Sequence, residues 1–85
     1  MNKIVKINEC TYKLRFVNAL KNATNKSLLE CKNIADSVIK TEFKNGSIQY
    51  SYGILLLNKS SITQEQWESV ANAMKDELEW EYVEP

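Results

Sequence analysis

The spacing of hydrophobic residues changes several times along this 85-residue chain, and each change marks a new predicted element. Residues 2–9 alternate, with Val5 and Ile7 on one face and Ile4 on the other, which is typical of a strand. Residues 13–24 change to the spacing of an amphipathic helix, with an apolar side made of Leu14, Val17 and Leu20 and flanked by Phe16 and Ala23. Asn25-Lys26 interrupts this pattern. A second helix is predicted after it, with apolar positions at Leu28, Cys31, Ile34, Ala35 and Val38.

The middle of the chain has the pattern of a β-hairpin. Asn45-Gly46 is a strong signal for a type I′ turn, because both residues tolerate positive φ. A turn there sets Phe43 opposite Ile48 and Thr41 opposite Tyr50. The second strand is expected to continue through residues 52–57, with Gly53 marking a bulge.

Both later helices have sequence signals for their N-termini. Ser27 with Glu30, and Thr63 with Gln66, fit the capping box, in which two side chains satisfy the first free amides of a helix. The third helix is predicted to bury a stripe made of Trp67, Val70, Ala71, Met74 and Leu78, with Ile62 before the cap packing on Trp67 as a hydrophobic staple. Residues 79–84 alternate again, with Trp80 and Tyr82 on one side, and predict a closing strand.

The predicted order is therefore β-α-α-β(β)-α-β. Because helices and strands alternate along the chain, we expect an α/β (α+β) fold. The predicted architecture is a two-layer sandwich with the helices packed on one face of a small sheet. Eighty-five residues are enough for one domain, which we assign to residues 1–85.

Composition narrows the class of protein. Hydrophobic residues are 44% and charged residues 26%, which is typical of a globular domain and excludes a disordered chain. No apolar run is long enough to cross a bilayer, and the N-terminus lacks the apolar core of a signal peptide. We therefore expect a cytoplasmic protein with no membrane partner.

The residues that usually carry catalysis are scarce. The chain has no His, which removes the commonest general base and the commonest metal ligand. Cys10 and Cys31 are expected to be free, partly buried thiols in a reducing compartment, and no pair of carboxylates lies in a recognisable catalytic motif. We expect no enzyme activity, no metal, no cofactor and no small-molecule substrate.

The net charge is zero, but the positive and negative residues are unevenly distributed along the chain. Residues 1–44 hold nine Lys/Arg and four Asp/Glu, whereas residues 45–85 hold two Lys and seven Asp/Glu. If the fold keeps the two halves apart, one face attracts acidic partners; if it interleaves them, the charges partly cancel. Arg15 is the one arginine, which argues against sequence-specific reading of nucleic acid but leaves non-specific attraction to phosphate open.

The stretch from residue 13 to residue 37 resembles the two central helices of the C-terminal domain of the bacterial ribosomal stalk protein (large-subunit protein seven/twelve). The alignment has no gaps, with matches at Lys13, Ala19, Ala23, Thr24, Leu28, Glu30, Lys32 and Ser37, and apolar equivalents at Leu14, Val17, Leu20 and Ile34. Because the sequence begins almost directly with this domain, we expect the protein to lack the dimerising segment and hinge of a stalk protein. We therefore expect a stand-alone domain rather than a true stalk protein.

The resemblance implies a function. In that family the two-helix face recruits translation factors, so by position the partner-binding candidates are Lys13, Leu14, Val17, Lys21, Leu28, Glu30 and Lys32. We expect an adaptor or inhibitor that binds a protein of the translation or transcription machinery. The chain departs from the family in its Asn25-Lys26-Ser27 loop, in Asn18 at a family basic position, and in the longer segment 40–61.

Other interpretations remain open at this level. Leu14 and Val17 could be core residues under a solvated lysine face. The aromatic residues Tyr50, Tyr52, Trp80 and Tyr82 could stack on a partner or simply cover the sheet. An alternative function is an RNA-associated regulator or antitoxin-like protein, whose lysines would contact phosphate; a Lys- and Asn-rich composition is typical of an AT-rich virus or mobile element.

Overall fold

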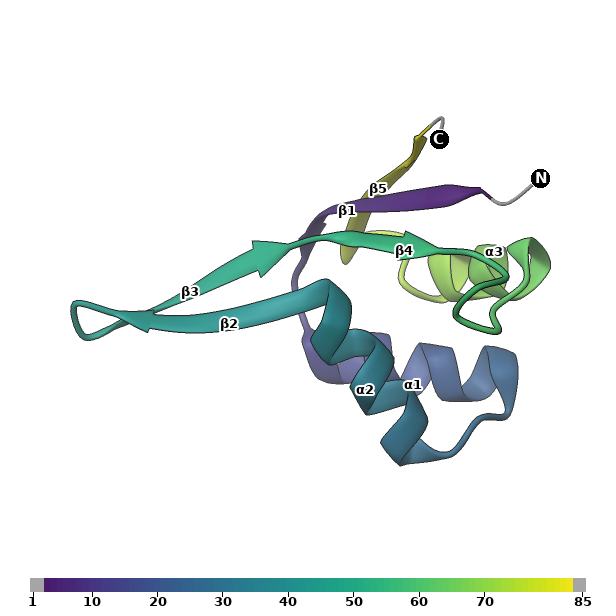
Figure 1. Cartoon of the computed structure of the whole chain (residues 1–85), viewed down its shortest axis with the longest axis horizontal. Coiled ribbons are helices and arrows are strands. Elements are labelled where there is room, and N and C mark those ends of the chain that lie inside the picture. Colours follow the sequence, from purple (N-terminus) through teal and green to yellow (C-terminus); the bar gives the residue numbers. More distant parts are fainter. Residues whose placement is uncertain (1–2, 84–85) are drawn as a thin grey trace.

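The computed structural model describes residues 3–83, which form three helices and five strands. Figure 1 shows a body of helices beneath a small sheet, with a long hairpin projecting from it. The elements follow the chain as β1 (Ile4–Cys10), α1 (Lys13–Thr24), α2 (Leu28–Val38), β2 (Ile39–Lys44), β3 (Ser47–Tyr52), β4 (Ile54–Leu56), α3 (Gln64–Ala73) and β5 (Leu78–Val83). The predicted fold class is confirmed. The predicted strand ends at residues 2 and 84 lie outside the described residues.

The body is built on a three-stranded antiparallel sheet in the order β4-β1-β5. Val5 in the central strand pairs with Leu55 on one side and with Tyr82 on the other. Val5, Ile7 and Leu55 are buried on the face that the helices cover, whereas Lys6 and Ile54 are exposed on the opposite face. The alternation predicted for the first strand is therefore confirmed.

The centre of the core is a chain of aromatic rings. The fully buried Trp67 of α3 makes edge-to-face contacts with Phe16 of α1, at 6.1 Å between ring centroids, and with Trp80 of β5, at 5.4 Å. Trp80 in turn packs against Tyr82 at 4.8 Å, so both lie on the same side of β5 as predicted. These contacts join the sheet to α1 and α3 in one core.

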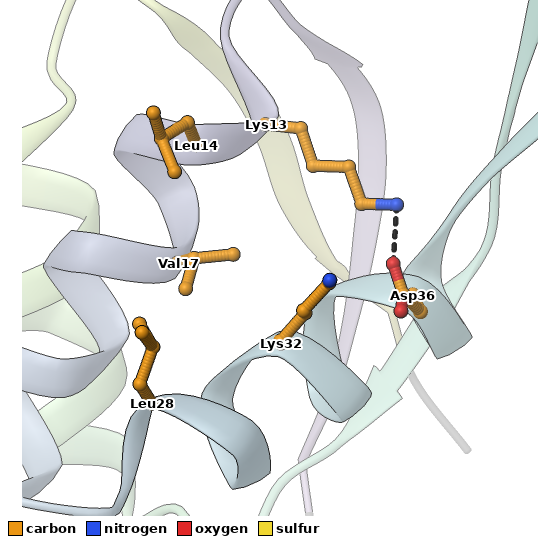
Figure 2. Close-up of a pocket in the computed structure, with 6 residues that line it drawn as sticks. All are labelled: Lys13, Leu14, Val17, Leu28, Lys32 and Asp36. Atoms are coloured by element: carbon orange, nitrogen blue, oxygen red, sulfur yellow. Dashed lines mark ion pairs between the residues drawn. The ribbon is translucent and has the colours of Figure 1, made fainter.

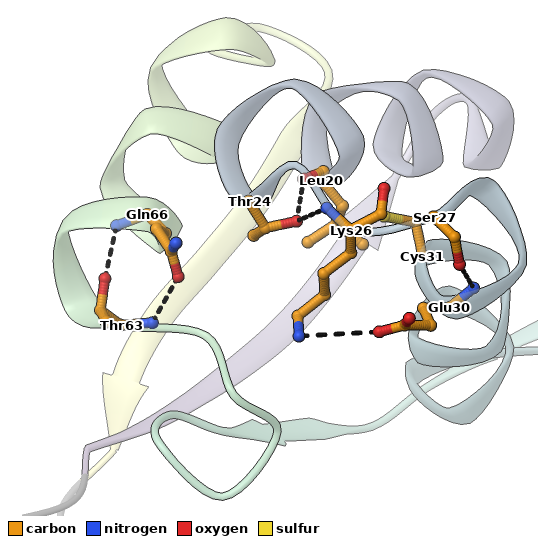
Figure 3. A network of polar contacts seen from close by, with 8 residues as sticks. All are labelled: Leu20, Thr24, Lys26, Ser27, Glu30, Cys31, Thr63 and Gln66. Atoms are coloured by element: carbon orange, nitrogen blue, oxygen red, sulfur yellow. Dashed lines mark hydrogen bonds and ion pairs between the residues drawn. The ribbon is translucent and has the colours of Figure 1, made fainter.

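The ends of the helices follow from local side-chain chemistry, much of which is visible in Figure 3. Asn25 ends α1 in the left-handed conformation, with φ of 59°, as a short polar residue can. Ser27 Oγ then accepts a hydrogen bond from the Glu30 amide at 3.1 Å and caps α2. The Glu30 side chain turns instead to Lys26, 3.8 Å from its Nζ, so this cap uses the Ser27 side chain alone.

The predicted capping box of α3 is confirmed in full. Thr63 Oγ1 accepts from the Gln66 amide at 3.1 Å, and Gln66 Oε1 accepts from the Thr63 amide at 2.9 Å (Figure 3). The predicted end of this helix is wrong, because α3 stops at Ala73 and the chain turns so that Leu78 begins β5. Leu78 is buried as expected, but from the strand.

The hairpin of β2 and β3, here called the arm (residues 39–52), has the predicted register. Phe43 pairs with Ile48 and Thr41 with Tyr50, around Asn45 and Gly46 at φ of 54° and 78°. The arm does not join the three-stranded sheet but forms a separate two-stranded sheet that extends away from the body (Figure 1). Gly53 separates β3 from β4, and its amide donates to the Val38 carbonyl at 2.7 Å.

Replacing Trp67 tests this arrangement of the core. We expect Trp67→Ala to lower the free energy of unfolding by roughly 3–5 kcal/mol, because it leaves a cavity between α1, α3 and β5. Thr63→Ala should cost only about 1 kcal/mol, because it removes one cap. Urea melts of the two variants check this, and equal costs would contradict the placement of Trp67 in the core.

Candidate binding groove on the two-helix face

A groove of about 370 Å³ lies between α1 and α2. Figure 2 shows side chains from both helices around the same hollow. Six residues line it: Lys13, Leu14, Val17, Leu28, Lys32 and Asp36. Five of them are among the residues predicted for partner binding, and Asp36 is the addition.

Helical spacing explains why these residues share a surface. Leu28, Lys32 and Asp36 are each four residues apart, so they form one row along α2. Lys13 and Val17 are likewise four apart on α1, with Leu14 beside them. Asp36 was absent from the sequence prediction, although its spacing from Lys32 was a signal that could have indicated it.

The apolar residues of the groove divide into a floor and a rim. Val17 is only 5% exposed and belongs to the core, so it forms the floor. Leu14 is 71% exposed and Leu28 is 54% exposed, so both leucines stand at the rim. The core interpretation is therefore right for Val17 and wrong for Leu14. Exposed leucines flanking a buried floor are a surface that a partner could cover.

The rim also carries charge. Lys13 Nζ forms an ion pair with Asp36, and this pair links the start of α1 to the last turn of α2 (Figure 2). Among residues 3–83, no ion pair engages Lys32, whose side chain lines the groove (Figure 2). The groove therefore has a net positive charge that comes from Lys32, because Lys13 is neutralised by its partner.

Two predicted site residues lie outside the groove lining. Lys21 is exposed on α1, one helical turn beyond Val17, and extends the positive surface in that direction. Glu30 points to the other side of α2, where it pairs with Lys26 (Figure 3). Its placement is that of a structural residue near the helix start, where a carboxylate interacts favourably with the helix dipole.

The aromatic residues considered as a stacking platform are divided between two sheets. Tyr52 is half-buried at the base of the arm, and its hydroxyl donates to the Cys10 carbonyl at 3.3 Å. Trp80 and Tyr82 lie in β5 beside the core, whereas Tyr50 is exposed on the arm. Tyr50 is therefore the most exposed of the four rings, at 56%, and Tyr82 follows at 37%.

The two cysteines are free and buried, as expected. Burial raises the pKa of the Cys10 thiol, and the nearby Glu77 carboxylate raises it further, so this thiol is a poor nucleophile. No group of three or more His, Cys, Asp or Glu side chains within residues 3–83 could hold a metal ion.

Comparison with known proteins gives no relative, since no family model, curated protein or solved structure matches this chain. Within residues 3–83, no helix has the length and apolar character needed to cross a membrane.

Alanine substitutions should separate the floor of the groove from its rim. We expect Val17→Ala to destabilise the fold by roughly 2 kcal/mol, because it removes buried methyl groups. Leu14→Ala should change the stability by less than about 0.5 kcal/mol, because its side chain is mostly in water. Thermal or urea unfolding measures both. A large cost for Leu14→Ala would mean that Leu14 packs in the core and is no part of a free surface.

Proposed function

We propose that this protein is a non-enzymatic binding module that contacts a protein partner through the groove between α1 and α2, acting as an adaptor or inhibitor. The observation that carries the proposal is the pair of exposed leucines, Leu14 and Leu28, on either side of the buried Val17. By the resemblance to the stalk domain, the partner belongs to the translation or transcription machinery.

The chemistry of the groove suits a protein surface better than a small molecule. Its volume is near the lower end for ligand pockets, and its leucine rim is open to solvent. A partner side chain that enters between Leu14 and Leu28 would remove both leucines from water, and full burial of a leucine contributes roughly 1.5–3 kcal/mol. Contacts of this kind, apolar at the centre and polar at the rim, are typical of protein interfaces.

The charge of the face supports a partner with acidic residues. Lys32 and Lys21 are exposed beside the apolar centre, and no ion pair within residues 3–83 engages either of them. Such lysines increase the rate of encounter with an acidic partner more than they increase affinity. The same lysines favour the alternative function, an RNA-associated regulator or antitoxin-like protein, because they could contact phosphate.

Two groove variants test the proposal. Immobilised protein would be used to capture partners from a cell lysate, with Leu14→Ser and Lys32→Glu compared against the unchanged chain. We expect both variants to lose at least nine-tenths of the captured partner while keeping a normal melting curve. Lys75→Glu is the matched control, since it makes the same charge change at an exposed position outside the groove and should capture normally.

An RNA probe separates the two functions. We expect a fluorescent 20-nucleotide single-stranded RNA to bind weakly, with equal affinity for the unchanged chain and for Leu14→Ser. Tight RNA binding that falls steeply between 50 and 200 mM salt, and is lost in Lys32→Glu, would support the RNA alternative instead. Retention of every protein partner by both groove variants would contradict the proposal.

A further inference from the structure

The arm carries an apolar face that no other part of residues 3–83 covers. Strand pairing sets Phe43 beside Ile48 and Thr41 beside Tyr50, and these four residues lie on one face by the two-residue alternation of strands. Phe43 is 73% exposed, and Ile48 and Tyr50 are each 56% exposed. At the base of the same face, Ile39 pairs with Tyr52 and is fully buried in the core.

The opposite face of the arm is polar throughout. It carries Lys40, Glu42 and Lys44 from β2, with Ser47, Gln49 and Ser51 from β3. The arm is therefore an amphipathic two-stranded ribbon standing in solvent (Figure 1). A lone ribbon of this kind is marginally stable in water, and further strands or another packed layer are needed to hold it.

We propose that the apolar face of the arm packs against the same face of a second copy of this chain, so that the protein forms a two-fold homodimer. Two amphipathic ribbons placed face to face, about 10 Å apart, make a small four-stranded sandwich. Phe43, Ile48 and Tyr50 of both copies would then lie inside it, and the lysines and Glu42 would point outward on both sides.

Charge favours a second copy over a different partner. The apolar face carries no charged residue, so it offers a foreign partner no electrostatic complement and repels no copy of itself. The net charge of the chain is zero, so two whole molecules do not repel each other at long range. The interface is also isologous, so each copy covers the apolar face of the other. No apolar face is then left for a third copy, and the assembly is limited to a dimer.

The size of the face sets the strength of the dimer. At about 200 Å² for a full aromatic or large aliphatic side chain, the exposed parts of the three residues amount to roughly 350 Å² per copy. The pair would bury roughly 700 Å², well below the 1,200–2,000 Å² or so that stable interfaces bury. We therefore expect a weak dimer, with a dissociation constant on the order of 100 µM.

Sedimentation velocity over a range of about 10 µM to 1 mM measures this association. We expect the unchanged chain to shift from monomer to dimer across that range, and Phe43→Ser to raise the dissociation constant at least tenfold. Leu14→Ser is the matched control, because Leu14 is equally exposed, at 71% against 73% for Phe43, but lies in the groove. This control should dimerise normally.

A dilution series of amide NMR spectra adds the location of the contact. We expect concentration-dependent shifts at residues 41–44 and 47–50, and none around the groove. Three results would overturn the proposal: a chain that stays monomeric at 1 mM, a dimer that survives Phe43→Ser, or a dimer that Leu14→Ser disrupts. A monomeric chain would assign the face to a different protein, and disruption by Leu14→Ser would assign self-association to the groove.

Discussion

The burial of Trp67 is the interaction on which the rest of this structure depends. Its ring contacts Phe16 and Trp80, so one side chain joins three elements that are far apart in the sequence: α1, α3 and β5. Strand β5 also pairs with β1 from Ile4 to Cys10, so the position of β1 depends on the same contacts. In a domain of 85 residues, where little core is available, one large side chain at this position carries much of the stability.

This core also determines which surfaces remain for function. Phe16 and Leu20 bury one side of α1 in the core, so the neighbouring row with Leu14 and Val17 faces α2 and the solvent. The Lys13–Asp36 ion pair then ties the two helices at one end of the groove. The arm is joined to the core at Ile39 and Tyr52, while its outer half lies beyond the body. The groove and the arm are therefore separate surfaces on one small framework.

Sequence reasoning succeeded where a local rule decides the conformation. Asn45-Gly46 determined both the turn and the register of the arm, and Thr63 with Gln66 determined the start of α3.

Sequence reasoning failed where contacts between distant elements decide the conformation. Leu78 continues the helical spacing of the apolar residues in α3 and also fits the alternation of β5. The spacing of apolar residues therefore could not reveal that α3 ends at Ala73. Alternation indicates which face of a strand is apolar but not which strand lies beside it, so the independence of the arm was missed. Similarly, Leu14 and Val17 have the same hydrophobic character, and only packing distinguishes the rim from the floor.

One aromatic core preforms the groove and leaves the arm outside it. Native-state amide hydrogen exchange at low protein concentration tests this most directly, because it measures the opening free energy of each element separately. We expect the amides of Val17 and Leu20 in α1 to exchange only through global unfolding, with the same opening free energy as Val70 in α3 and Ile7 in β1. Amides of the outer arm, residues 41–50, should exchange through local opening with much less protection. An α1 that opens independently of α3, or an arm as protected as β1, would contradict it.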